Sequence, residues 1–161
     1  MGVNRGKQWE KRFETDWRRS FPKGAVIRLP DQQSGLKGSR NICDYICFDG
    51  SHLFLNECKA ITGNTFPIGN FTQLNTLLQY ADCPGIRAGV VIWYVDHSRV
   101  VYVPVACFNQ LVLDGLKSVN INKTDFSKYN IVEIPVRKLR VFVEGDYTIL
   151  STLGDDYGRC N

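Results

Sequence analysis

The sequence lacks any apolar run long enough to cross a membrane. No stretch of its 161 residues approaches the roughly 18 consecutive apolar residues that a transmembrane helix needs. Residues 1–7 also lack the apolar core of a signal peptide and the Ser or Thr of a myristoylation site. These absences predict a soluble, cytoplasmic protein with no membrane partner.

The residues that commonly build zinc sites are scarce. Histidine occurs only twice, and the six cysteines include no C-x2-C pair. These features disfavour a zinc site, although Cys43 and Cys47 would share one face of a strand. Since nothing indicates a secreted protein, disulfides are disfavoured as well, and the sequence favours free, buried thiols.

Positive charge is concentrated at the N-terminal end. The net charge is +4, but residues 1–40 hold ten Lys and Arg against four Asp and Glu, or +6, which leaves −2 for the other 121 residues. An asymmetric basic end indicates a polyanionic partner, with nucleic acid first among the candidates. The alternative interpretation is a solvated helix face with no partner.

An amphipathic helix is predicted over residues 4–20. Trp9, Phe13 and Trp17 recur every four residues with charges between them, which is the spacing of one helix face. The aromatic stripe is interpreted as core packing and not as a platform for stacked bases. Glu10 and Glu14 lie one turn apart on a neighbouring face, and the sequence does not decide which of them faces a site.

Two strands with acidic residues follow. Residues 41–48 and 53–59 are rich in apolar and β-branched side chains, and Asp49-Gly50 between them has turn chemistry. Because side chains alternate along a strand, Glu57 and Lys59 should project together, and hairpin pairing should bring Asp44 towards them. Carboxylates that converge beside an ammonium group suit Mg²⁺ or Mn²⁺ and phosphoryl chemistry. The alternative is a solvated strand edge.

The rest of the chain completes an α/β pattern. A first strand is predicted at 25–29 and a mobile basic loop at 30–40. The later elements are predicted as a helix at 70–81 with a capping box formed by Asn70 and Gln73, strands at 87–95 and 99–103, a helix at 104–113, strands at 131–134, 139–143 and 147–150, and a flexible tail at 154–161. With no linker or repeat, residues 1–161 are predicted to form one domain, in which helices flank a central mixed β-sheet.

The ordered motifs resemble the PD-(D/E)xK nuclease superfamily. Asp44 matches its first Asp, and Glu57-Cys58-Lys59 matches (D/E)xK. Within it, residues 4–145 look most like the RecU-type Holliday junction resolvases of bacteria and their phages. The further matches are Asn4-Arg5-Gly6-Lys7 with Glu10, the run 66–71, and the predicted hairpin before Pro104. The short segment before Asp44 looks closer to the archaeal-type resolvases.

The resemblance implies a restriction-endonuclease-like core and a site residue set. Mg²⁺, with Mn²⁺ as a substitute, would be ligated by Asp44, Glu57, Glu10 and the main-chain carbonyl of Cys58, and Lys59 would orient or polarise the attacking water. The DNA contacts would come from Arg5, Lys7, Arg12, Lys37 and Arg40, with Gln73 as a further candidate. Because a four-way junction has two-fold symmetry, a homodimer is implied.

The sequence therefore predicts a Mg²⁺-dependent, structure-selective endonuclease that resolves four-way DNA junctions in recombination and repair, in a bacterial or phage-infected cell. Two alternatives remain open. One is a different DNA nuclease of the same superfamily, such as a restriction-like enzyme or a replication nickase. The other is a non-catalytic DNA-binding module that keeps the fold.

Overall fold

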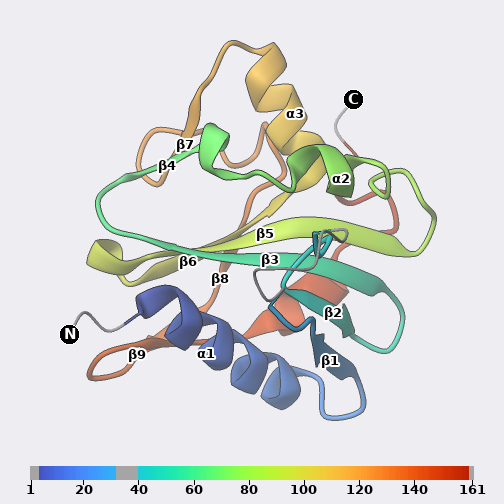
Figure 1. Ribbon diagram of the computed structural model, residues 1–161, viewed down its shortest axis with the longest axis vertical. Helices are drawn as coiled ribbons and strands as arrows, with labels where there is room; N and C mark the ends of the chain where they lie inside the picture. Colours follow the sequence, from blue (N-terminus) through green and yellow to red (C-terminus); the bar gives the residue numbers. More distant parts are fainter. Residues whose placement is uncertain (1–3, 32–39, 160–161) are drawn as a thin grey trace.

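A six-stranded mixed sheet forms the centre of the computed structural model, which describes residues 4–31 and 40–159. Its strand order is β1-β2-β3-β5-β6-β8, and only β3 and β5 run parallel (Figure 1). The strands are β1 (Ala25–Arg28), β2 (Tyr45–Phe48), β3 (Leu53–Ile61), β5 (Ile86–Tyr94), β6 (Arg99–Pro104) and β8 (Val132–Ile134). The predicted α/β class with a mixed sheet is confirmed.

Helices and small two-stranded sheets cover both faces of this sheet. One face carries the helix α1 (Arg5–Ser20), and beside it lie the hairpin β9–β10 and the 3₁₀ helix η3 (Figure 1). The other face carries α2, α3 and the two-stranded sheet of β4 and β7. These elements are β9 (Val136–Lys138), β10 (Val143–Gly145), η3 (Tyr147–Thr152), α2 (Leu74–Leu78), α3 (Val105–Leu113), β4 (Thr65–Pro67) and β7 (Ser118–Asn120), with short 3₁₀ turns η1 (Ile68–Asn70) and η2 (Val95–His97).

The aromatic stripe of α1 fixes this helix on the sheet. Asn4 caps the helix by accepting a hydrogen bond from the Lys7 N–H at 3.2 Å. Trp9, Phe13 and Trp17 are completely buried, and the ring of Trp9 lies 5.3 Å from that of Trp93 on β5. Burying large aromatic side chains stabilises a fold by about 2–3 kcal/mol each, so the stripe is core packing, as predicted.

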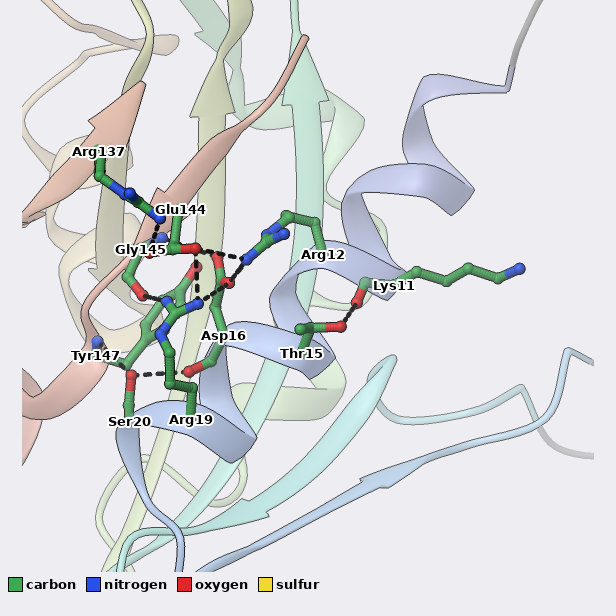
Figure 2. A network of polar contacts seen from close by, with 10 residues as sticks. All are labelled: Lys11, Arg12, Thr15, Asp16, Arg19, Ser20, Arg137, Glu144, Gly145 and Tyr147. Atoms are coloured by element: carbon green, nitrogen blue, oxygen red, sulfur yellow. Dashed lines mark hydrogen bonds and ion pairs between the residues drawn. The ribbon is translucent and has the colours of Figure 1, made fainter. Parts of the chain in front are cut away.

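A buried carboxylate at the flank of the aromatic stripe ties α1 to the hairpin. Asp16 is fully buried, and its carboxylate binds the guanidinium groups of Arg12 and Arg19 and accepts the Gly145 N–H at 2.8 Å (Figure 2). Glu144 on β10 completes the network by pairing with the same two arginines. A buried charge is tolerated when it is paired and hydrogen-bonded in this way.

Replacing Asp16 with alanine should therefore loosen the hairpin from α1. We expect a loss of about 2 kcal/mol in the free energy of unfolding, below the roughly 3–5 kcal/mol typical of a fully buried pair, because Arg12 and Arg19 keep access to water. Urea unfolding would measure the loss. Thr15→Ala, on the exposed side of the same helix, is the control and should change stability by less than about 0.5 kcal/mol.

The C-terminal third differs most from the prediction. Residues 139–142 form the tip of the hairpin, closed by a 2.8 Å hydrogen bond from the Leu139 N–H to the Phe142 carbonyl, so the predicted strand at 139–143 is wrong. The predicted strand at 147–150 is a 3₁₀ helix, because the Asp146 side chain caps it by accepting the Thr148 N–H.

Residues 154–159 do not form a separate tail. The buried Arg87 donates to the carbonyl oxygens of Leu150, Leu153 and Gly154, and the Tyr157 hydroxyl donates to that of Asn130.

The second helix is shorter than predicted. The capping box of Asn70 and Gln73 does not form, because Asn70 belongs to η1 and α2 begins only at Leu74. The Gln73 side chain instead accepts a hydrogen bond from the Thr72 hydroxyl. The chain turns at Phe71, whose buried ring lies 5.3 Å from that of Phe108, so tertiary packing overrides the local capping signal.

The prediction of free thiols holds for four cysteines. Cys43, Cys47 and Cys58 are free and buried, and Cys83 is free and partly buried. Burial raises the pKa of the Cys43 thiol to about 12, so this group is protonated and unreactive at neutral pH. Cys107 is disulfide-bonded, and there the prediction is wrong. No helix in the described ranges is long and apolar enough to cross a bilayer.

Candidate active site

The β2–β3 hairpin brings Asp44 beside the acid–Lys pair. The Asp49 side chain accepts the N–H groups of Ser51 and His52, and Gly50 takes a positive φ of 110°, which closes the turn. The resulting register pairs Tyr45 with Asn56. Asp44, one residue earlier, therefore lies level with Glu57.

Backbone contacts hold Asp44 in place. Its Oδ2 accepts the Cys58 N–H at 2.8 Å, and its carbonyl oxygen accepts the Leu29 N–H at 2.9 Å. The carboxylate is thus fixed against the middle of β3 by main-chain groups, which do not depend on side-chain rotamers.

Glu57 and Lys59 project from one face of β3, as strand alternation predicts. The Lys59 Nζ lies 2.8 Å from the Glu57 Oε1. Between them, Cys58 packs on the other face among the aromatic residues that α1 covers. Glu57 is only 1% exposed, whereas the Lys59 side chain keeps 29% of its surface exposed. The ammonium group can therefore reach a bound substrate, and the carboxylate beneath it is shielded.

The two carboxylates repel each other in a poorly hydrated position. Burial, and then the charge of Glu57, raise the pKa of Asp44 to about 7. Burial also raises the pKa of Glu57, although Lys59 opposes that shift. The Glu57 Oε2 is buried without a hydrogen-bond partner. A buried, unpaired carboxylate oxygen is costly, so this pair favours binding of a cation.

The two acids of α1 differ in their surroundings, and Glu10 is the one whose charge reaches the carboxylate pair. Its negative charge raises the pKa of both Asp44 and Glu57. Its carboxylate lies 3.0 Å from Arg28 on β1. Glu14 instead pairs with Arg18 on its own helix at 2.8 Å. Of the two helix acids, Glu10 is therefore the one whose charge reaches both carboxylates.

The donor set fits a hard divalent cation. Within residues 4–31 and 40–159, no group of three or more His, Cys, Asp or Glu side chains is arranged to hold a metal. Mg²⁺, however, is commonly bound through one or two carboxylates, waters and substrate phosphates. Asp44 and Glu57 supply the two carboxylates, and the unpartnered Oε2 of Glu57 supplies a free ligand atom.

The predicted DNA contacts fall into three groups. Arg5 and Arg40 are exposed, and Lys7 is exposed in a 3.6 Å ion pair with Asp31. Arg12 belongs to the Asp16 network and therefore has a structural role. Gln73 contacts Thr72 and has no described contact with the site residues, and Lys37 lies outside the described residues.

Arg28 is a site residue that the sequence did not single out. It bridges Glu10 and Asp31, at 3.0 and 3.2 Å, so one guanidinium connects the helix acid to the end of β1. The residue is one cation in a short strand, and its partner lies 18 positions away. Only a prediction of the packing between β1 and α1 could have identified it.

The sequence and the fold were compared with those of known proteins. No model of a known family and no curated protein matches the sequence. Sixteen chains of solved structures resemble the fold. One is Hjc, a Holliday junction resolvase from the archaeal hyperthermophile Archaeoglobus fulgidus, with 18% sequence identity, 63% of this chain and 78% of that chain covered, and a TM-score of 0.49.

Proposed function

We propose that this protein is a divalent-metal-dependent endonuclease on a restriction-endonuclease-like core, and that four-way DNA junctions are its preferred substrate. The observation that carries the proposal is the buried pair of carboxylates, Asp44 and Glu57, with Lys59 bound to one of them and a carboxylate oxygen left without a partner. Carboxylates beside a lysine are suited to phosphodiester hydrolysis.

Asp44 and Glu57 would hold Mg²⁺ or Mn²⁺, together with the main-chain carbonyl of Cys58. Glu10 would join or tune this set, since its charge already acts on both carboxylates. When bound, the metal supplies an acidified water and positive charge for the phosphate oxygens.

The side chains of the site would orient the reacting groups. Glu57 fixes the ammonium group of Lys59 by their 2.8 Å contact, so Lys59 can position the attacking water or stabilise a non-bridging phosphate oxygen. The Cys58 N–H keeps Asp44 in place. Arg5, Lys7 and Arg40 would contact the DNA backbone without reading bases.

The choice of a junction rests on the resemblance of the ordered motifs to the resolvases. Coordinated cuts in opposite strands of a two-fold symmetric junction require two sites, and a symmetric homodimer supplies them.

A substrate panel tests this proposal. We expect Mg²⁺-dependent cuts in a four-way junction, symmetric in opposite strands, at rates at least about tenfold above those on linear duplex, flaps and single strands of the same sequences. Mapped cut positions and initial rates would measure this. Equal cutting of every substrate would refute junction selectivity and favour another nuclease of the superfamily. Binding without any cutting would favour the non-catalytic module.

A further inference from the structure

The tip of the β9–β10 hairpin combines exposed cations with an exposed apolar residue. Arg137, Lys138 and Arg140 are all exposed, and no acidic residue occurs from 136 to 143. Arg137 pairs with Glu144 at 3.1 Å, whereas Lys138 and Arg140 have no ion-pair partner among residues 4–31 and 40–159. A bend that was merely solvated would not need this density of unpaired positive charge.

An apolar groove lies next to these cations. Val141 is 69% exposed, and the neighbouring Phe142 ring lies 5.5 Å from the ring of Trp93 on β5. The groove, of about 330 Å³, is lined by Arg5, Gln8, Trp93, Val95, Val141 and Phe142. The Trp93 Nε1 is buried without a hydrogen-bond partner. The groove thus offers aromatic and aliphatic surface with a guanidinium group in its lining.

The hairpin packs on the α1 face of the sheet, whereas Glu57 and Lys59 project from the face that carries Val90 and Ile92. On one flank of α1, Asp16 binds the Gly145 N–H of the hairpin (Figure 2), and on the other flank Glu10 binds Arg28 beside the carboxylates. The side chain of Lys11 points away from the hairpin network and is exposed (Figure 2). Lys11 therefore adds an exposed cation on the solvent side of α1.

The tip offers positive charge to phosphates, and the groove offers apolar surface to a sugar or a base. Charge complementarity therefore makes DNA, the substrate already proposed, the best-fitting occupant.

We propose that the β9–β10 hairpin is a second DNA contact, outside the active site. Lys138 and Arg140 bind phosphates of the DNA backbone away from the scissile bond, and Val141 and Phe142 pack against a deoxyribose or a base in the groove. This inference rests on the proposed nuclease function and adds a binding surface that raises affinity and leaves the chemical step unchanged.

Matched charge variants test the hairpin. In the full chain, K138Q/R140Q removes two charges at the tip, and K117Q/K123Q removes two exposed charges near β7 on the opposite face of the sheet. Single-turnover cleavage of a labelled four-way junction at rising protein concentration gives a half-saturating concentration and a maximal rate. We expect K138Q/R140Q to raise the half-saturating concentration roughly tenfold and to lower the salt slope by about 2, with the maximal rate unchanged. The control should stay within about twofold.

A third variant separates the apolar contact from charge. Val141→Ser should raise the half-saturating protein concentration severalfold. It should leave the salt slope unchanged, because no phosphate contact is lost. If wild type cuts and K138Q/R140Q behaves like K117Q/K123Q, the hairpin inference is overturned while the nuclease function stands. A reduced maximal rate with unchanged half-saturation also overturns it. If wild type neither binds nor cuts any DNA, the proposed function itself has failed.

Discussion

Replacing Lys59 with alanine should slow cleavage of a four-way junction by about a thousandfold and leave affinity for the junction within about threefold. Removal of one preorganised positive group at a reacting oxygen costs about 3–4 kcal/mol in the transition state. Lys59 contributes little to affinity because its charge is already neutralised by Glu57 at 2.8 Å. Single-turnover rates and a gel-shift titration, run in parallel, would measure the two quantities.

The variant needs two controls, because it also leaves Glu57 buried without its cationic partner. Thermal unfolding would show whether the fold persists, and Lys123→Ala, an exposed lysine outside the site, removes the same charge without touching the carboxylates. A loss of affinity as large as the loss of cleavage rate would contradict the expectation that Lys59 acts on the reaction and not on binding. Lys59 would then be a DNA anchor and not a group that acts on the reaction.

The parts of the fold that could be predicted from sequence are those set by neighbouring residues. The spacing of Trp9, Phe13 and Trp17 already specifies one buried helix face, and all three are completely buried. The Asp49-Gly50 turn likewise fixes the β2–β3 register through backbone and side-chain contacts within four residues. Asp44 and Glu57 therefore come together for a local reason, although they are 13 positions apart.

The parts that failed depend on distant partners. A pattern of apolar residues at 139–150 suits a strand, but Asp16 and Ser20 of α1 bind the backbone of Gly145 and Tyr147, and this anchors a hairpin followed by a 3₁₀ helix. Arg12 is indistinguishable in sequence from the other N-terminal cations, yet its partner Glu144 lies 132 positions away. Arg28 could not be identified from sequence for the same reason, since its partner Glu10 lies 18 positions away. Charge counts indicated a basic N-terminus without showing which cations are already neutralised.

In the absence of metal, Asp44→Asn should make the protein more stable by roughly 3 kcal/mol at pH 8. The pKa of Asp44 is raised to about 7 by burial and by Glu57. Each pKa unit above the unfolded value of ~3.9 corresponds to about 1.4 kcal/mol of lost stability, and the partial exposure of the carboxylate reduces this loss. Asparagine has the same shape and can still accept the Cys58 N–H, so the substitution removes the repulsion and keeps the contact. Sites that bind cations commonly reduce stability in this way.

The pH dependence follows from the same shift. Because the carboxyl group binds its proton more tightly in the folded state, the folded protein holds more protons than the unfolded chain between about pH 4 and pH 7. The stability of wild type should thus fall as pH rises through that window and stay lower above it. Urea unfolding in EDTA at pH 5.5 and pH 8.0 would measure this, and the advantage of Asp44→Asn should be about half as large at pH 5.5.

Mg²⁺ provides the decisive comparison. A cation held between Asp44 and Glu57 stabilises only the folded state, so adding Mg²⁺ at pH 8 should raise the unfolding midpoint of wild type and have much less effect on Asp44→Asn. Asp82→Asn, at an exposed acid away from the site, should respond to Mg²⁺ as wild type does. If Asp44→Asn were less stable than wild type in EDTA at pH 8, the carboxylates would be compensated by contacts within the protein. The two carboxylates would then provide no electrostatic reason to bind a metal at that position.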